Sequence, residues 1–282
     1  MEYTRKSLAD LILTRLDAEA ERMAAQWSKP GQIRSCCIDE LLPAEVVYQI
    51  DRVFPVPDRM VLKKSMRENK HVAAQMDAYH PVLEEIVYAF QDERILDKVA
   101  QITGLRAMEP DSELYAGGIS AMRQGAYLRP HLDNSHDAKR ERYRVLNLLY
   151  YVTPGWSEAD GGALQLWDYG PDGEPRTIAS LCNRLVLMAT DKHSWHSVNE
   201  VRKDGVRACV SNYYFSKVSP EEQDYFHATS FRQEHGAGLS DLVMQADNAL
   251  RTAILKLTGD KLYKNPHVYK RGSADEDEDK AA

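Results

Sequence analysis

The chain has 282 residues, a formal net charge of −7, 43% hydrophobic residues and 28% charged residues, which is an ordinary balance for a soluble globular protein. No apolar run approaches the ~18 residues that a membrane-spanning helix needs, and no broad basic stripe indicates a nucleic-acid partner. The N-terminal segment lacks the apolar core of a secretory signal, so we expect a cytoplasmic protein with neither membrane nor nucleic-acid partners. The four cysteines form no CxxC pair, which disfavours a zinc knuckle or a disulfide framework.

The first third of the sequence is predicted to be mostly helical. Apolar residues recur at helical spacing within 5–27, and Pro30 with Gly31 ends that helix. Further elements are expected as a strand at 32–38, a second helix from Leu42 and two helices within 81–103 that Gly104 closes. The basic segment 61–72 is ambiguous, so we predict only that residues 1–110 form a helical region that packs on the remainder.

From about residue 113 the pattern changes to short runs rich in Val, Leu, Ile and Tyr, separated by turn signals. The predicted strands are 114–122, 126–133, 144–152, 163–168, 175–180, 184–189, 194–201 and 206–215. Short strands at this spacing are typical of a double-sheet jelly roll.

We therefore predict one compact, mainly β domain with flanking α-helices, built on a jelly-roll core of the double-stranded β-helix or cupin-like type. The core is expected at 111–218, packed against the N-terminal helices. A C-terminal extension at 219–270, with a helix at 239–258, and a disordered acidic tail at 271–282 complete the prediction.

His131 and Asp133 stand two residues apart in a predicted strand, so their side chains point to the same face and can reach one ion. His196 lies on a later predicted strand, which a jelly roll can bring beside the earlier one. Two imidazoles and one carboxylate form a facial triad that suits Fe(II), whereas structural zinc sites more often use thiolates. A His-x-Asp triplet alone is weak evidence, and a surface histidine beside a turn aspartate is its alternative interpretation.

The stretch from about Asp111 to Ser216 resembles the 2-oxoglutarate- and Fe(II)-dependent dioxygenases, specifically their prolyl-4-hydroxylase-like branch. The matching blocks are GAYLRPHLD at 125–133, RVLNLLYYV at 144–152, GGALQLW at 161–167, NRLVLM at 183–188, HSV at 196–198 and RACVSNYYF at 207–215. Several blocks in the same order are far more specific than any single motif.

The resemblance implies that His131, Asp133 and His196 are the catalytic iron ligands. It also implies that Arg207 forms a salt bridge with the distal carboxylate of 2-oxoglutarate through its planar guanidinium. Tyr151 matches a tyrosine that contacts the same carboxylate.

Asn147 matches a polar position that faces the same pocket. The expected cofactor is Fe(II), with 2-oxoglutarate and O2 as co-substrates and ascorbate as a stimulant. Asp133 fills the position that halogenating relatives leave open, so hydroxylation is favoured over halogenation. A tyrosine that many relatives carry before the His-x-Asp strand has no clear equivalent, because Met122 and Leu128 stand near its place.

Candidate substrate contacts are Arg129, His136, Arg144 and Trp167. Arg129 shares the strand face of His131, and Arg144 begins the next strand, where it can face the pocket. The polar segment 134–142, which contains His136, is interpreted either as a lid over the substrate or as a solvated loop. Trp167 is interpreted as a rim aromatic that stacks on a ligand or as a core residue.

Three functions fit the sequence. The first is a 2-oxoglutarate-dependent dioxygenase that hydroxylates an unactivated C–H bond of a small molecule or an amino-acid-type substrate. The second is a prolyl hydroxylase that acts on a protein or peptide. The third, from a different class, is a jelly-roll protein that binds a metal or a ligand without catalysis.

Overall fold

The computed structural model describes residues 3–221, 223–234 and 268–269. Its α-helices are α1 (Arg5–Trp27), α2 (Ala44–Val53), α3 (Pro81–Ala89) and α4 (Glu93–Thr103). Its strands are β1 (Ser35–Ile38), β2 (Val61–Lys64), β3 (Glu68–Ala73), β4 (Met108–Glu109), β5 (Gly118–Arg123), β6 (Tyr127–Leu132), β7 (Tyr143–Tyr151), β8 (Leu164–Leu166), β9 (Arg176–Ile178), β10 (Arg184–Ala189), β11 (His196–Val198), β12 (Val206–Ser216) and β13 (Ser230–Phe231). Single 3-10 turns lie at Pro57–Arg59, Met76–Ala78 and Glu158–Asp160.

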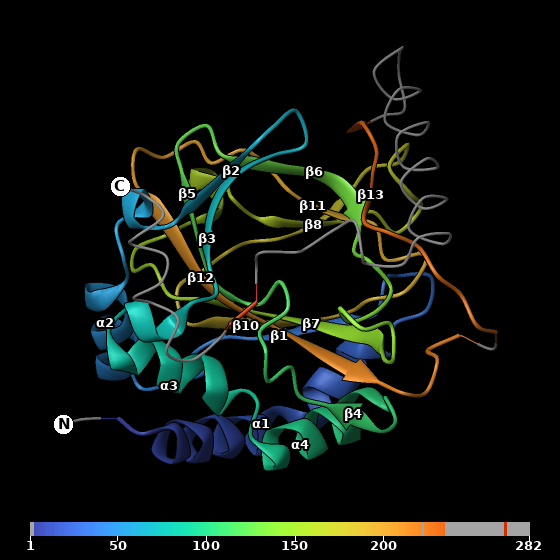
Figure 1. Cartoon of the computed structure of the whole chain (residues 1–282), viewed down its shortest axis with the longest axis horizontal. Helices are drawn as coiled ribbons and strands as arrows, with labels where there is room; N and C mark the ends of the chain where they lie inside the picture. The colour runs from blue at the N-terminus through green and yellow to red at the C-terminus, as the bar shows by residue number, and fades with distance from the viewer. Residues whose placement is uncertain (1–2, 222, 235–267, 270–282) are drawn as a thin grey trace.

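The strands form one sheet that curls until two of its walls face each other (Figure 1). The strand order is β1-β10-β7-β12-β5-β3-β6-β11-β8-β9, with β2 on β3, β4 on β12 and β13 on β6. Strands β5 and β6 follow each other in the sequence but do not pair, and β3 connects them in the sheet by pairing with both. The predicted mainly β jelly-roll architecture with flanking helices is confirmed.

Helices α1, α3 and α4 gather on one side of the molecule, beyond the wall that contains β7 and β10 (Figure 1). Thr4 caps α1 through a capping box with Ser7, and the buried stripe of α1 includes Leu8, Ile12 and Leu16. These residues share one hydrophobic core with the outward-facing residues of the sheet, namely Leu146, Leu148, Tyr150, Leu185 and Leu187. The helices therefore hold this wall on its outer face and leave its inner face to line a cavity.

A β-bulge interrupts the pairing of β7 with β12 near the start of β7. Tyr214 pairs with Leu146, but the next residue, Phe215, pairs with Arg144, so Val145 is an extra residue in β7. Because side chains alternate along a strand, an unbroken β7 would point Arg144 to the helix side with Leu146. The bulge turns Arg144 to the inner face instead, where it lines the cavity.

Several element boundaries agree closely with the sequence prediction. The helix at 5–27 and the strand at 184–189 have the predicted limits, and Gly104 ends α4 with a left-handed φ of 72°. The strand predicted at 114–122 begins later, at Gly118, because Leu114 and Ala116 adopt positive φ values of 48° and 66° in the preceding turns.

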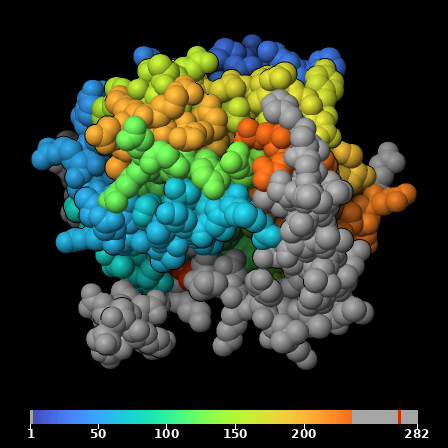
Figure 2. Space-filling model, turned by 90° about the horizontal axis from the view of Figure 1, so that it is seen from above, coloured from blue at the N-terminus to red at the C-terminus, as the bar shows by residue number. Residues whose placement is uncertain are grey.

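The ambiguous segment 61–72 forms the β2–β3 hairpin, which the sequence analysis did not identify. The hairpin lies on the surface beside the segment that contains β6 and exposes Val61, Leu62 and Met66 (Figure 2). The helix predicted at 239–258 and the acidic tail at 271–282 fall outside the described residues. Within the part of the chain that the structure describes, no helix combines the length and the apolar character that a bilayer crossing requires.

Candidate functional site

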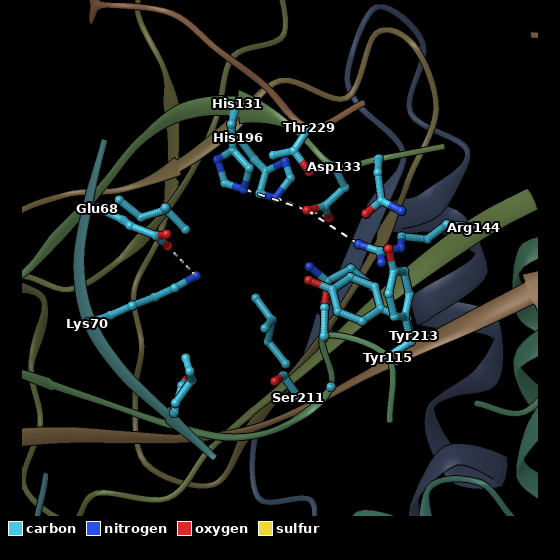
Figure 3. A pocket seen from close by; sticks show the side chains of 18 of the residues that line it. Glu68, Lys70, Tyr115, His131, Asp133, Arg144, His196, Ser211, Tyr213 and Thr229 are labelled. Atoms are coloured by element: carbon cyan, nitrogen blue, oxygen red, sulfur yellow. Dashed lines mark ion pairs between the residues drawn. The ribbon is translucent and has the colours of Figure 1, made fainter. Parts of the chain in front are cut away.

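The side chains of His131 and Asp133 meet that of His196, which is distant in the sequence, inside the curled sheet (Figure 3). His131 on β6 lies directly opposite His196 on the antiparallel strand β11, and their ring centroids are 4.1 Å apart. Asp133 follows the end of β6 and points to the same place. One ligand atom from each residue lies within 4.8 Å of the other two. The strand register thus brings His196 to His131, and the two-residue spacing of His131 and Asp133 completes the predicted triad.

Both imidazoles are oriented by the backbone. The Nδ1 atom of His131 lies 2.9 Å from the carbonyl oxygen of Arg129, and the Nδ1 atom of His196 lies 2.9 Å from the carbonyl oxygen of Ser194. A carbonyl oxygen accepts only from a protonated nitrogen, so each ring donates through Nδ1 and keeps Nε2 free as a ligand. The Nε2 atoms lie 3.7 Å (His131) and 3.6 Å (His196) from the two carboxylate oxygens of Asp133.

The protonation states of these groups suit a divalent cation. Burial lowers the pKa of His131 to about 3, with the neighbouring His196 as a second cause, so His131 is a neutral imidazole. Burial alone would raise the pKa of Asp133, but His196 and Arg144 outweigh it and lower that pKa. The buried Oδ2 of Asp133 has no hydrogen-bond partner among the described residues. Two imidazoles that present Nε2 and one carboxylate with an unpartnered oxygen fit Fe(II) as a ligand set.

A cavity of about 580 Å³ opens beside the triad, which is within the usual range for a ligand pocket. Arg207 on β12 lines one part of it, is 3% exposed, and packs its guanidinium 4.8 Å above the ring centre of Tyr151. Burial raises the pKa of Tyr151 to about 12, so its hydroxyl is neutral. The side chain of Arg207 passes so close to Gly162 that a Cβ there would lie 2.7 Å from the Arg207 Cδ.

Arg144 lines another part of the cavity, next to the triad. Its guanidinium lies 4.0 Å from the ring centre of Tyr213, and its Nη1 is 3.6 Å from Asp133 Oδ1 (Figure 3). Asn147, one of the predicted pocket residues, also lines the cavity, and its buried Oδ1 has no partner among the described residues. The inner face of β7 thus supplies two polar side chains to the cavity.

His136 is the second predicted substrate contact, after Arg144, that lines the cavity. Its segment is not a solvated loop, because the buried Asp137 accepts hydrogen bonds from the Arg142 Nε at 2.8 Å and from the Glu141 backbone N–H at 2.9 Å. Asn134, Asp137 and Arg140 of the same segment also line the cavity. Of the two interpretations of 134–142, the structure therefore agrees with a wall or lid of the cavity.

Two predicted substrate contacts are not among the residues that line the cavity. Arg129 would share the face of His131 in an unbroken strand, but its guanidinium lies 3.3 Å from a Glu234 carboxylate oxygen and 4.7 Å from the ring centre of Tyr127. Trp167 is 1% exposed and donates through Nε1 to Ser197 Oγ at 2.8 Å, so it is a core residue. The pairing of β6 with β11 shifts register between His131 and Leu128, and Leu128 lines the cavity in place of Arg129, so simple alternation from His131 does not hold at Arg129.

Sequence reasoning missed the residues opposite and beside Arg144. Lys70 and Glu68 on β3 form an ion pair at 3.2 Å on the far wall, within the hairpin that was not predicted (Figure 3). Tyr115 flanks Arg144 from an irregular turn that carries no sequence signal. Tyr213 could have been found, because it shares the alternation of Arg207 on the same strand. Met122 and Leu128, at the place of the missing family tyrosine, both line the cavity and make that side apolar.

Comparison with known proteins finds sequence similarity in the region that contains the triad and Arg207. Residues 117–215 match the model of the 2OG-Fe(II) oxygenase superfamily. The curated relatives include prolyl 3-hydroxylase OGFOD1 from Xenopus laevis, which is 36% identical over 84 residues, or 28% of this chain and 16% of the relative. The Mus musculus protein of the same name is 29% identical over 105 residues, or 36% of this chain and 19% of the relative. The match thus spans less than a fifth of either relative.

Solved structures share the fold at low sequence identity. A prolyl-4-hydroxylase from Pseudomonas putida superposes with a TM-score of 0.50 at 17% identity, covering 69% of this chain and 98% of its own. A prolyl hydroxylase from Trichoplax adhaerens, in complex with a hypoxia inducible factor peptide fragment, gives 0.51 at 16% identity, covering 73% and 92%. Residues 117–215 of this chain thus match the 2OG-Fe(II) oxygenase superfamily, and the solved structures that share the fold include prolyl hydroxylases.

Proposed function

We propose that this protein is a 2-oxoglutarate-dependent dioxygenase that hydroxylates an unactivated C–H bond. The observation that carries the proposal is the convergence of His131, Asp133 and His196 at the head of a buried cavity that also contains Arg207. In such a centre, bound Fe(II) and 2-oxoglutarate activate O2, yield succinate and CO2, and place one oxygen atom on the substrate carbon.

The protein residues supply ligands, orientation and a dry environment. His131, Asp133 and His196 would hold the metal on one face and leave the opposite face to the cavity. Arg207 would bind the distal carboxylate of 2-oxoglutarate through a charge-assisted hydrogen bond, which burial strengthens. The guanidinium of Arg207 packs on the ring of Tyr151. The ring of Phe231 stacks on His131, with ring centroids 5.2 Å apart, and shields that imidazole from solvent.

The relatives favour a prolyl group as the part of the substrate that is oxidised. The curated matches are named prolyl 3-hydroxylases, and the structural neighbours are prolyl hydroxylases, one of them in complex with a peptide. Both a prolyl residue of a peptide and a free amino acid or other small molecule remain candidate substrates under this proposal. Neither a membrane nor a nucleic acid is part of the proposal.

The proposal is tested with the purified full chain. Anaerobic addition of Fe(II) to the protein with 2-oxoglutarate should produce the charge-transfer absorption band of a chelated complex, and admission of O2 with ascorbate should produce succinate. The variant His196→Ala should lose both signals, whereas Asp204→Ala, which removes an exposed carboxylate, should keep both. A wild-type chain that binds Fe(II) without the band and without succinate would instead support the binding-protein function.

A further inference from the structure

Arg144 is a buried cation whose hydrogen-bonding capacity is only partly used. Its side chain is 1% exposed and lies between aromatic rings, with ring centres at 4.0 Å for Tyr213, 5.6 Å for Tyr115 and 5.7 Å for Phe215. These rings fix the plane of the guanidinium but accept none of its in-plane hydrogen bonds. An arginine held this rigidly inside a cavity can bind a planar group with little further loss of conformational freedom.

The unused donors of Arg144 form one edge of its guanidinium. Nη1 faces Asp133 Oδ1 at 3.6 Å, whereas Nε and Nη2 are buried and have no hydrogen-bond partner among the described residues. Nε and Nη2 are adjacent nitrogens whose N–H bonds run parallel, so they match the two oxygens of a carboxylate. A charged group with two buried, unpaired donors is costly, which favours an anionic occupant at this edge.

The surrounding charges leave Arg144 short of a counter-ion. Asp133 is its ion-pair partner among the described residues, and a metal bound to the triad would share the charge of that carboxylate. Burial raises the pKa of the nearby Asp111 to about 7, so this second carboxyl supplies only a partial charge near neutral pH. On the far wall Lys70 is already neutralised by Glu68 at 3.2 Å.

The position of Arg144 separates its role from that of Arg207. Arg144 is the second residue of β7 and Arg207 is the second residue of β12, and these strands run antiparallel, so the two arginines stand at opposite ends of the strand pair. Arg144 reaches the cavity only because of the bulge at Val145. Bulges beside active sites commonly re-aim one side chain, and here the re-aimed side chain lies next to a metal ligand.

We propose that the Nε/Nη2 edge of Arg144 binds a carboxylate of the substrate, so that the hydroxylated C–H bond belongs to an amino-acid-type unit with a free carboxylate. The inference rests on the proposed dioxygenase function and deepens it. Two sources offer this chemistry, namely a free amino acid or imino acid and the C-terminal residue of a peptide. An internal prolyl residue, whose carbonyl is an amide, lacks it.

The first experiment compares matched acids and amides with the full chain, Fe(II) and 2-oxoglutarate. Substrate-stimulated succinate formation is measured for free amino acids, including L-proline, against their carboxamides. The same measurement compares peptides that end in proline against their C-terminal amides and against peptides with internal proline. Acids should exceed amides by about 100-fold or more in kcat/KM, because an amide leaves a buried charged donor without its anion. The two series distinguish a free amino acid from a peptide C-terminus.

Variants show whether Arg144 is the residue responsible. Arg144→Gln and Arg144→Lys should each raise the KM for the stimulating acid at least about tenfold, since neither keeps the two-pronged contact. Both should retain the Fe(II)/2-oxoglutarate band and the KM for 2-oxoglutarate. Lys139→Gln removes a positive charge from an exposed position of the neighbouring loop and should change neither KM.

A binding measurement keeps the inference testable if no compound of the panel is turned over. The sample is the Zn(II)-substituted protein with 2-oxoglutarate and ¹⁵N-labelled arginine. The Nε–H signal of Arg144 is identified as the one that disappears in Arg144→Lys. This signal should shift on addition of acetate or L-proline. Sodium chloride at equal ionic strength should not shift it. An unshifted signal would overturn the inference.

The outcomes separate the two proposals. Absence of the charge-transfer band in the wild-type chain would refute the proposed dioxygenase function itself. A normal band together with equal activity on acids and amides, or a normal substrate KM in Arg144→Gln, would remove only the role of Arg144.

Discussion

Gly162 offers a direct test of how the Arg207 side chain is positioned. The residue has a φ of +70°, and an added Cβ would lie 2.7 Å from Arg207 Cδ and 3.0 Å from Val201 Cγ2. Such contacts are too short to persist, so Gly162→Ala must displace Arg207, which is the more flexible neighbour. Gly155 has a similar φ of +64° but nothing within 4 Å of an added Cβ, so Gly155→Ala is a matched control for backbone strain.

The two substitutions should separate stability from co-substrate binding. A left-handed alanine costs about 1–2 kcal/mol, so both variants should be destabilised by that amount. A charge-assisted hydrogen bond contributes about 1.5–3 kcal/mol, and losing half or more of it weakens binding about tenfold. Gly162→Ala should therefore raise the KM for 2-oxoglutarate about tenfold, whereas Gly155→Ala should leave this KM unchanged.

Urea unfolding measures the stability of both variants, and succinate formation at varied 2-oxoglutarate concentrations measures the KM. The anaerobic absorption titration gives the affinity for 2-oxoglutarate independently of turnover. The reasoning fails if Gly162→Ala keeps the wild-type KM while losing stability like its control, because the co-substrate would then not depend on where Arg207 lies.

Further predictions concern the metal, the pH dependence and the core. His131→Ala should abolish the anaerobic Fe(II)/2-oxoglutarate band while far-UV circular dichroism stays native. The pKa of Asp111 is about 7 in the folded state against 3.8 for the free group, so the folded protein keeps a proton that the unfolded chain releases. Its contribution to stability is therefore fully present below pH about 4 and is lost as pH rises towards about 7, by up to about 4 kcal/mol. Asp111→Asn should flatten that fall in urea unfolding. Trp167→Phe removes the hydrogen bond to Ser197 and should cost about 1–3 kcal/mol without changing the KM for 2-oxoglutarate.

The ligand residues were accessible to sequence reasoning because alternation along one strand decides which side chains share a face. His131 lies in β6 and Asp133 directly follows that strand, and the two still point to the same place. The pairing of His196 with His131 is a matter of register between strands that lie far apart in the sequence, and no local pattern encodes it. Its prediction depended on the family resemblance, which supplies the order of the strands.

The misplaced residues show where alternation stops being informative. Arg129 has the alternation of a cavity residue, yet a register shift in the pairing of β6 with β11 leaves Leu128 in the cavity and Arg129 beside Glu234. Arg144 has the alternation of a core residue relative to Asn147, yet the bulge at Val145 reverses it. A face can therefore be predicted from spacing only where the strand is regular, because the presence of a bulge depends on the partner strand.

The β2–β3 hairpin escaped prediction for a related reason. Its residues 61–64 and 68–73 are polar and basic enough to resemble a surface loop, and Val61 and Leu62 are exposed in the folded chain. What makes β3 a strand is its pairing with β5 at one end and with β6 at the other. Both partners follow much later in the sequence, so the tertiary arrangement overrides weak local preference.

The antiparallel pairing of β7 and β12 gives the cavity its chemical polarity. Each strand carries an arginine at its second position, so pairing them head to tail separates Arg144 and Arg207 by eight or so residues along the pair, or roughly 25 Å of backbone. The triad lies on the wall that contains β6 and β11, and Asp133 is its member next to Arg144. Two anions bound at opposite ends would then approach the metal from different directions. Under the two proposals, 2-oxoglutarate at Arg207 and a substrate carboxylate at Arg144 would therefore occupy the cavity together. A substitution of Arg144 that raised only the KM for 2-oxoglutarate, or a substitution of Arg207 that raised only the KM for the substrate, would contradict this arrangement.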